Sequence, residues 1–433
     1  MRITVVGAGY VGLTTAACFA HLGHEVMVVE KLRHKVELLN SGKVPIYEPG
    51  LEELISQNLS VKRLFLTTEI EQGLDFSSVI FICVGTPENP DGSADLSQVE
   101  EVARQCANIK SDYKLLVEKS TVPVNTHKLI KKTLERYSKD TNQSFEVASN
   151  PEFLREGSAI EDFLNPDRIV IGVESQRAKE IFLELYKDFN CPIIFTDPST
   201  AELIKHASNS FLATKISFIN MIADLCERVG ADVKLVADGM GFDKRIGRAF
   251  LNAGLGFGGS CFPKDLKAFI KIANSYGLDF GLLREVERIN SQRAINFVQK
   301  VKDALWNIKG KTLAIWGLSF KPNTDDIREA PSMRVIELLL KEGANLRLYD
   351  PKAALNFSRL FPSSERILYL EDKYEALKGA CALLIITEWP EFENANLETI
   401  KELLELPLIF DGRNIFDPKR MQQLGFEYYA MGR

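Results

Sequence analysis

Short apolar runs alternate with helical patterns over about the first 195 residues of the chain. Five runs have the length and composition of strands: residues 3–6, 25–29, 79–84, 115–117 and 169–173. The segments between them place apolar residues at helical spacing. Strands that alternate with helices in this way favour a parallel sheet that is covered by helices on both faces.

One long helix is predicted next. Ser199 and Glu202 have the spacing of a capping box at its start. Gly230 can end it. The apolar positions between them are Leu203, Ala207, Leu212, Ile219 and Ile222. About 30 residues make a helix of roughly 45 Å, which is long for a globular domain. We expect it to form a spine between two domains or a dimer interface.

From about residue 308 the first pattern returns, with strands predicted at 312–316, 346–349, 383–387 and 408–410. The two ends of the chain therefore resemble each other in pattern, although no sequence repeat is strong enough to prove a duplication. We predict an α/β protein with two Rossmann-like, doubly wound domains joined by the long central helix. The predicted boundaries are 1–197, 198–305 and 306–433.

Composition narrows the class of protein. With 433 residues, 45% of them hydrophobic and 26% charged, the chain has the size and balance of a soluble protein of two or three domains. A net charge of -6 gives no indication of a nucleic-acid or membrane-surface partner. No apolar run of about 18 residues is present, and Met1 leads straight into a strand, so we expect neither a membrane span nor a signal peptide.

The cysteines indicate a reducing environment. Seven are scattered along the chain, and none forms a CxxC pair, so neither a zinc site nor a disulfide framework is predicted. We expect no metal, and we expect the protein to be cytoplasmic.

A dinucleotide-binding turn follows the first predicted strand. In the sequence GAGYVG, Gly7 allows a tight turn, Gly9 lets a pyrophosphate approach the backbone, and Gly12 lets helix and strand pack closely. Glu30 ends the next strand, 23 residues after Gly7, where a carboxylate binds ribose hydroxyls and repels a 2′-phosphate. The turn therefore favours NAD over NADP, although the nearby Lys31 and Arg33 weaken that preference slightly.

A cysteine in a glycine-rich loop is the main candidate for chemistry. Cys261 follows GFGGS, and Lys264 and Asp265 come three and four positions later. A thiolate is the reactive form of cysteine, and a nearby cation such as Lys264 lowers its pKa. Asp265 is a candidate proton handler. Cys261 could instead be a core cysteine, as Cys83 in an apolar strand is expected to be, but a glycine-rich loop suits a close approach of backbone to ligand.

Other polar positions lie where ligands bind in such folds. Lys205 and Asn209 are four apart on the long helix and could hold an oxyanion together, or they could form a solvated face. Residues 84–87 and 120–121 end later strands, as ligand-binding turns do, and ordinary turns would look the same. Glu152 and Glu156 would share a face if a helix begins there, and could bind sugar hydroxyls, activate water or serve only as charges at a helix start.

These residues together resemble a known family. The motifs are GAGYVG (7–12), VGTP (84–87), KSTV (119–122), NPEFLREG (150–157), NPDRIVIG (165–172), KHASN (205–209), RIGRAFLNAGLGFGGSCFPKD (245–265), GLSFKPNTDDIRE (317–329) and DGRN (411–414). In order and joint occurrence they resemble the UDP-glucose/GDP-mannose dehydrogenase family over nearly the full length. Position 30 carries Glu where the family frequently has Asp.

The resemblance implies a reaction. Its UDP-glucose branch oxidises the C6 alcohol of UDP-glucose to the carboxylate of UDP-glucuronate, with two NAD and one water. Cys261 is implied to form a thiohemiacetal and then a thioester, and Lys205 and Asn209 to stabilise the oxyanions. Asp265 and Thr121 are implied to handle protons through a water, and Glu152 to assist thioester hydrolysis.

The resemblance also implies binding residues and domain roles. The cofactor set is Gly7, Gly9, Tyr10, Val11, Gly12, Glu30, Lys35, Gly85, Thr86, Thr121, Glu156, Lys264 and Arg328. The substrate set is Glu152, Phe153, Leu154, Glu156, Lys205, Asn209, Arg245, Phe250, Phe257, Gly258, Gly259, Phe262, Phe320, Lys321 and Arg413. Arg245 is expected to enter the neighbouring subunit's site, which implies a homodimer. The three domains then become an NAD-binding domain, a central dimerisation domain with the cysteine loop, and a UDP-sugar-binding domain.

Two alternatives stay open at this point. The sister enzyme GDP-mannose 6-dehydrogenase shares the cysteine loop, but tends to have Leu where this chain has Phe262. UDP-N-acetylmannosamine dehydrogenases depart from this loop pattern. A protein of another class, which binds NAD or a nucleotide sugar without catalysis, would be expected to have lost some of the implied catalytic residues.

Overall fold

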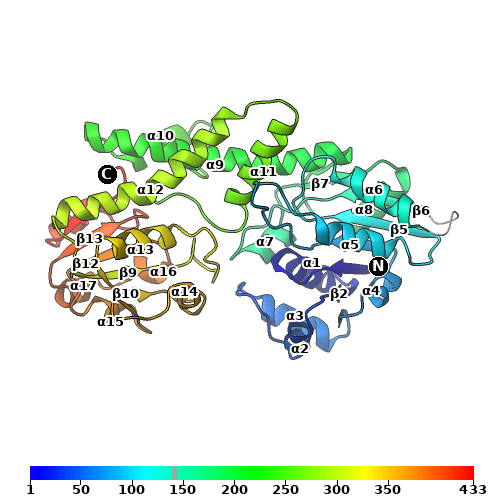
Figure 1. The fold of residues 1–433 in the computed structure, drawn as a ribbon, viewed down its shortest axis with the longest axis horizontal. Coiled ribbons are helices and arrows are strands. Elements are labelled where there is room, and N and C mark those ends of the chain that lie inside the picture. The colour runs from blue at the N-terminus through cyan, green and yellow to red at the C-terminus, as the bar shows by residue number, and fades with distance from the viewer. Residues whose placement is uncertain (139–143) are drawn as a thin grey trace. The chain divides into compact units, whose positions relative to one another are not determined.

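The computed structural model describes residues 1–138 and 144–433, which form two compact units. The first unit comprises Met1–Ser208 and Lys267–Leu278, and the second comprises Asn209–Leu266 and Asp279–Arg433 (Figure 1).

The first unit is built on one sheet. Its described strands are β1 (Arg2–Val6), β2 (Glu25–Val29), β3 (Leu64–Thr67), β4 (Val79–Ile82), β5 (Tyr113–Glu118), β6 (Ser144–Ser149), β7 (Ile169–Gly172) and β8 (Ile193–Thr196). They lie in the order β3-β2-β1-β4-β5-β6-β7-β8. The first six follow the Rossmann order, which confirms the predicted doubly wound class for this part of the chain.

The sequence pattern predicted a parallel sheet, but one pair of neighbouring strands in it is antiparallel. β7 pairs with β6 in the antiparallel direction, and only through Ser149 and Gly172, which are the last residues of the two strands. The connection between them, residues 150–168, contains the short helix α7 (Ala159–Leu164). β8 then pairs with β7 in parallel.

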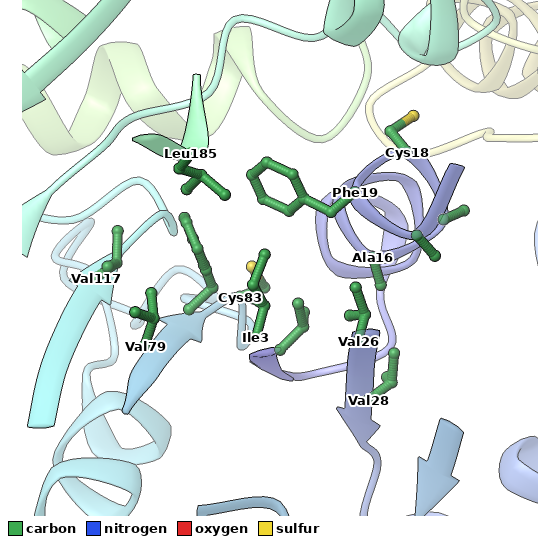
Figure 2. Packing of buried hydrophobic residues seen from close by; sticks show 14 of the residues in the cluster. Ile3, Ala16, Cys18, Phe19, Val26, Val28, Val79, Cys83, Val117 and Leu185 are labelled. Carbon is green, nitrogen blue, oxygen red and sulfur yellow. The ribbon is translucent and has the colours of Figure 1, made fainter. Parts of the chain in front are cut away.

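Helices cover both faces of this sheet. They are α1 (Tyr10–His21), α2 (Arg33–Asn40), α3 (Leu51–Ser60), α4 (Ile70–Phe76), α5 (Ser97–Cys106), α6 (Thr126–Tyr137), α7 and α8 (Gln176–Leu185). On one face Ile3 and Val5 of β1 pack with Phe19 of α1 and with α3, α7 and α8, as Figure 2 shows for Ile3, Phe19 and Leu185. On the other face Val6 packs with α4, α5 and α6. This alternation along β1 is the period of two that a strand requires.

The long helix α9 (Pro198–Val229) has residues in both units. Its end before Gly230 is as predicted, and Gly230 has the positive φ of +72° that favours glycine. The predicted capping box is wrong. Asp197, just before Pro198, accepts the N–H of Thr200 at 3.0 Å and caps the helix. Glu202 is drawn away because its carboxylate accepts the backbone N–H of His127 at 3.0 Å.

The second unit contains a second sheet, and Figure 1 labels β9, β10, β12 and β13 of it. Its described strands are β9 (Thr312–Trp316), β10 (Asn345–Tyr349), β11 (Ile367–Tyr369), β12 (Ala382–Ile385), β13 (Leu408–Asp411) and β14 (Glu427–Tyr429), in the order β11-β10-β9-β12-β13-β14. All paired neighbours are parallel. This strand order is again that of a Rossmann fold.

Helices also cover this sheet on both faces. The helices that follow α9 are α10 (Val233–Gly241), α11 (Phe262–Ser275), α12 (Gly281–Leu305), α13 (Pro331–Lys341), α14 (Ala354–Leu360), α15 (Lys373–Leu377), α16 (Pro390–Glu393), α17 (Leu397–Leu403) and α18 (Pro418–Gln423). α12, α13 and α14 contribute to the core on one face, and α15 to α18 to the core on the other. No helix among the described residues is long and apolar enough to cross a membrane.

The two sheets begin with the same local geometry. Gly7 donates its N–H to Val29 at 2.9 Å with φ +105°, and Gly317 donates to Tyr349 at 2.9 Å with φ +97°. Each glycine follows the first strand of its sheet and bonds the last residue of the second. The likeness seen in the sequence pattern therefore extends to the turn that a Rossmann fold uses for phosphate.

Candidate active site

The turn after β1 has the shape of a dinucleotide site. A Cβ atom at Gly7 would lie 2.6 Å from the carbonyl oxygen of Cys83, and one at Gly12 would lie 1.8 Å from the carbonyl oxygen of Gly7. A Cβ at Gly9 would meet no atom within 4 Å. Gly7 and Gly12 are thus required by packing, whereas Gly9 faces open space at the start of α1, where a pyrophosphate binds.

Glu30 lies at the end of β2, beside this turn. Its carboxylate accepts the N–H of Ala8 at 3.3 Å and that of Leu32 at 3.0 Å, and Lys35 of α2 approaches it at 3.9 Å. A carboxylate held by two backbone groups keeps lone pairs for ribose hydroxyls, so the residues present fit NAD.

The turns after β4 and β5 are joined by hydrogen bonds. Thr86 donates its hydroxyl to the carbonyl oxygen of Thr121 at 2.9 Å, and Ser120 donates to that of Val84 at 2.7 Å. Gly85 lies between the two bonded residues of its turn. The two predicted ligand-binding turns are therefore neighbours at the carboxyl edge of the sheet.

The segment 150–157 follows β6 and is irregular. No helix begins within residues 150–157, so the condition under which Glu152 and Glu156 would share a helical face is not met. Glu152 binds the backbone of its own segment, since its carboxylate accepts the N–H of Leu154 at 2.7 Å, and Gly157 has a φ of +82° that an ordinary helix does not allow. The helix starts only with α7.

Glu152 forms a buried ion pair with Lys205 of α9. The Lys205 ammonium lies 2.9 Å from Oε1 of Glu152 and 2.7 Å from its carbonyl oxygen, and it lies over the Phe153 ring at 5.3 Å from the centroid. Lys205 is only 4% exposed, which excludes the alternative of a solvated helix face. Lys205, Glu152 and Thr121 all belong to the first unit.

Asn209 and Asp265 meet in the second unit. The Asn209 amide donates to Oδ2 of Asp265 at 2.7 Å, and the Lys264 ammonium lies 2.7 Å from Oδ1. Asp265 is 1% exposed, so both carboxylate oxygens are bonded in a buried place. Lys264, which was expected to act on Cys261, forms its ion pair with Asp265.

Cys261 lies directly before α11, and its carbonyl oxygen accepts the N–H of Asp265 at 2.8 Å. It is partly exposed, and its Sγ is 3.5 Å from Oγ of Ser260. A helix N-terminus stabilises a thiolate. Cys83 is different, because burial raises the pKa of its thiol to about 12, as expected for a core cysteine.

The glycines before Cys261 are required by packing within the second unit. A Cβ at Gly258 would lie 2.2 Å from the carbonyl oxygen of Glu329, and one at Gly259 would lie 2.7 Å from the Phe320 ring. The Gly259 N–H also bonds the carbonyl oxygen of Arg328 at 2.8 Å. The loop thus lies directly against the segment 317–329, one of the motifs that carry the resemblance described above.

Aromatic rings surround the same loop. Phe257 and Phe262 pack edge to face at 5.8 Å between centroids, and Phe250 lies 6.2 Å from Phe262. These three rings were predicted to belong to the substrate site, and the structure places them together.

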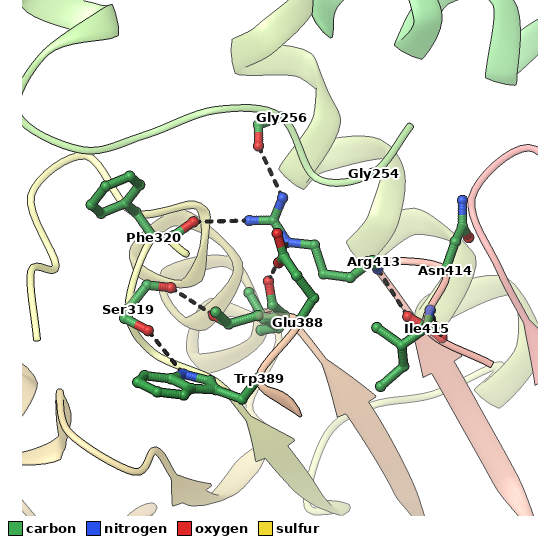
Figure 3. Close-up of polar contacts among 12 residues, drawn as sticks. Gly254, Gly256, Ser319, Phe320, Glu388, Trp389, Arg413, Asn414 and Ile415 are labelled. Atoms are coloured by element: carbon green, nitrogen blue, oxygen red, sulfur yellow. Dashed lines mark hydrogen bonds and ion pairs between the residues drawn. The ribbon is translucent and has the colours of Figure 1, made fainter. Parts of the chain in front are cut away.

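Arg413 follows β13 and binds three carbonyl oxygens, as Figure 3 shows. Its Nε donates to Ile386 at 2.7 Å, its Nη1 to Gly256 at 3.1 Å and its Nη2 to Phe320 at 3.2 Å, and Glu388 lies 3.1 Å from Nε. The sequence did not single out Glu388 as the partner.

The other cationic residues that were predicted to bind ligands contact neighbouring residues of their own segments. The Lys321 ammonium lies 5.6 Å from the centroid of the Phe320 ring. Arg328 pairs with Asp326 at 2.6 Å. Arg245 pairs with Asp243 at 2.6 Å, and its side chain is 89% exposed.

Comparison with known proteins agrees with the geometry. Residues 1–190 match the NAD binding domain of the UDP-glucose/GDP-mannose dehydrogenase family, 199–292 its central domain and 314–418 its UDP binding domain. The chain is similar to the UDP-glucose 6-dehydrogenase TuaD of Bacillus subtilis, with 46% identity over 432 residues that cover 100% of this chain and 93% of the relative.

Two further relatives extend this likeness. The UDP-glucose 6-dehydrogenase of Pseudomonas aeruginosa is 44% identical over 444 residues, which cover 100% of this chain and 98% of the relative. A solved structure of a UDP-glucose dehydrogenase from the hyperthermophilic archaeon Pyrobaculum islandicum has a TM-score of 0.92 and 40% identity, and the match covers 100% of this chain and 97% of that one. The chain belongs to the UDP-glucose/GDP-mannose dehydrogenase family.

Proposed function

We propose that this protein oxidises UDP-glucose at C6 to UDP-glucuronate, through a thiohemiacetal and a thioester on Cys261. The main support is the position of Cys261, partly exposed at the start of α11 and four residues before the Asp265 carboxylate that binds Asn209. The names of the full-length relatives point to the same substrate.

The first unit fits NAD, with Gly9 open to a pyrophosphate and Glu30 available to the ribose. Bound NAD supplies the hydride acceptor for both oxidations, so that one alcohol, two NAD and one water give one carboxylate, two NADH and three protons. The other residues assigned to the cofactor by the family resemblance are part of the same proposal.

In the first oxidation the C6 hydroxyl loses its proton. The family resemblance assigns the handling of this proton to Asp265 and Thr121, through a water. Lys205 and Asn209 would stabilise the negative charge that develops on O6.

In the second oxidation the Cys261 thiolate adds to the C6 aldehyde carbon and forms a C–S bond. Lys205 and Asn209 hold the oxyanion of this adduct. This adduct is oxidised to a thioester. Glu152 then takes a proton from water as the water attacks the carbonyl carbon of the thioester. The C–S bond then breaks, and the uronate leaves while the thiolate is restored.

The substrate would lie against the aromatic residues of the cysteine loop. The resemblance assigns the uridine diphosphate to Lys321 and Arg413, and the sugar to the segment 153–156 and to residues 257–259. We also retain the three domain boundaries at 197/198 and 305/306 as part of the proposal.

A homodimer is proposed from an apolar stripe on α9. Its exposed residues recur at helical spacing along the part of the helix in the second unit: Phe211, Phe218, Met221, Leu225 and Val229. Such a stripe is typical of a protein interface. Arg245, exposed and paired only with a near neighbour in sequence among the described residues, is free of the core and available to a partner's site. The seven free cysteines are consistent with a cytoplasmic location.

The test is the yield of NADH from a limiting amount of sugar nucleotide, measured by absorbance with UDP-glucose and separately with GDP-mannose. Two NADH per UDP-glucose, and none from GDP-mannose, is the expected result. Two per GDP-mannose would keep the chemistry and replace the substrate. One per sugar would mean that oxidation stops at the aldehyde and that Cys261 has another role.

A further inference from the structure

Two residues of α12, Asn290 and Arg293, contact the backbone that leads to Cys261. Both belong to the second unit, as does the loop. The Asn290 side chain accepts the N–H of Phe257 at 2.8 Å and donates to the carbonyl oxygen of the same residue at 2.9 Å. One amide thus binds both polar groups of one loop residue, as a neighbouring strand would.

Arg293 holds the loop three residues earlier. Its guanidinium is fully buried, donates from Nε to the carbonyl oxygen of Gly254 at 3.0 Å, and forms an ion pair with Asp224 of α9. Asn220 of α9 accepts the N–H of Gly254 at 2.8 Å. The backbone of Gly254 is therefore fixed on both sides by side chains from two helices.

Gly256 gives an independent indication that these contacts set the loop. A Cβ at this position would lie 2.3 Å from Oδ1 of Asn290 and 3.5 Å from Cγ of Arg293, and its φ is +91°. The absence of a side chain at Gly256 makes room for the two α12 side chains. Asn290 and Arg293 are three apart on the helix, so they share a face toward the loop.

We propose that Asn290 and Arg293 are positioning residues, which fix the loop so that the Cys261 thiolate reaches the aldehyde carbon. The inference rests on the proposed function and assigns these residues to the covalent step. Only residues 258–260 separate Phe257, which Asn290 binds, from Cys261. Reaction requires the attacking atom at about 3–3.5 Å, and a shift of about 1 Å can cost about 100-fold in rate.

The first test is Asn290→Ala, with Ser291→Ala as the matched control. Ser291 is on the same helix, is exposed and bonds only within its own helix among the contacts described here, to Arg288. The measurement is single-turnover NADH formation from the UDP-linked C6 aldehyde, together with the KM for the aldehyde and the Kd of NAD. We expect the single-turnover rate constant for aldehyde oxidation to fall by about 10- to 100-fold, with KM and Kd changed less than about twofold, and no change in the control.

The second test is Asn290→Asp, which also serves if the alanine variant does not fold. A protonated carboxyl has the donor and acceptor of the amide, whereas an ionised one repels the carbonyl oxygen of Phe257. The ratio of variant to wild-type aldehyde oxidation is therefore expected to rise as the pH falls from about 8 to about 5.5. A role in general packing would give a flat ratio.

Other results would overturn the inference. One is a rate of aldehyde oxidation equal to that of the wild type in both Asn290 variants. The other is a loss in NAD affinity and in the rate of the first oxidation as large as the loss in the rate of aldehyde oxidation. A failure of the proposed function looks different, because the wild-type protein itself would then give no second NADH, or Cys261→Ala would retain full turnover.

Discussion

The buried pair of Lys205 and Glu152 allows a stability prediction with a built-in control. We consider Lys205→Met, which keeps the length of the side chain and removes its charge. The two groups lie 2.9 Å apart, and each side chain is 5% exposed. The variant leaves the Glu152 carboxylate buried with the N–H of Leu154 as a remaining donor.

The magnitude follows from burial. Removal of one partner from a buried pair costs about 3–5 kcal/mol, because the other charge stays out of water without compensation. An exposed pair contributes little, because water screens its charges and the two side chains lose conformational freedom. Lys187 and Glu184 form such a pair in the same unit, at the same 2.9 Å, with side chains 55% and 58% exposed. Lys187→Met is therefore the matched control.

The assay is urea unfolding of the four proteins: wild type, Lys205→Met, Lys187→Met and the double variant Glu152→Gln/Lys205→Met. The glutamine removes the buried charge and keeps an acceptor for Leu154, so the double variant should recover about 2–3 kcal/mol relative to Lys205→Met. Equal losses in the two single lysine variants, or a double variant as unstable as Lys205→Met, would refute the reasoning.

Three further predictions concern other parts of the molecule. Cys261→Ser should lower net turnover by about a thousandfold or more, and NADH formation at the wild-type rate would contradict the covalent route. Gly9→Ala should raise the Kd of NAD about tenfold or more without a change in melting temperature, because the added Cβ meets no protein atom. Gly258→Ala should lower the stability by about 1–3 kcal/mol, because the added Cβ would lie 2.2 Å from a carbonyl oxygen. Calorimetry that finds Gly9→Ala less stable than Gly258→Ala would contradict this reasoning. Burial raises the pKa of Glu118 well above its usual value. The protonated Glu118 side chain therefore contributes to the stability of the fold below about pH 4.3, and this contribution is lost as the pH rises through the raised pKa. Glu118→Gln should remove this loss, and equal slopes of stability against pH in the two proteins would contradict it.

The sequence predicted the interior strands and missed the strands at the sheet edges. β1, β2, β4 and β9 are continuous apolar runs with neighbours on both sides, and each was predicted. The edge strands β3, β8, β11 and β14 were not predicted, because a strand bonded on one side only is partly exposed and carries a mixed pattern.

The site shows the same division between local and long-range information. The glycine turn of residues 7–12 and the cysteine loop could be predicted, since a turn, a strand end or a helix start is encoded within a few residues. The pairing of Lys205 with Glu152 spans 53 residues, and that of Asn209 with Asp265 spans 56. No periodicity encodes such contacts, and the capping box failed for the same reason, since Glu202 binds α6 instead of its own helix.

Asn290 and Arg293 could not be selected from the sequence. They lie in a helix whose pattern is that of an ordinary amphipathic segment, and the burial of Arg293 is visible only in the structure. Their role becomes visible only when the loop at Gly256 is seen against α12.

The most direct test of the account is mass spectrometry of the peptide that carries Cys261, quenched during turnover of UDP-glucose and NAD. The Glu152→Gln variant is used, since slower hydrolysis should let the intermediate accumulate. The account predicts a UDP-glucuronyl thioester on Cys261 that disappears in Cys261→Ser. An unmodified Cys261 in a variant that still releases two NADH per enzyme subunit in a burst would contradict it.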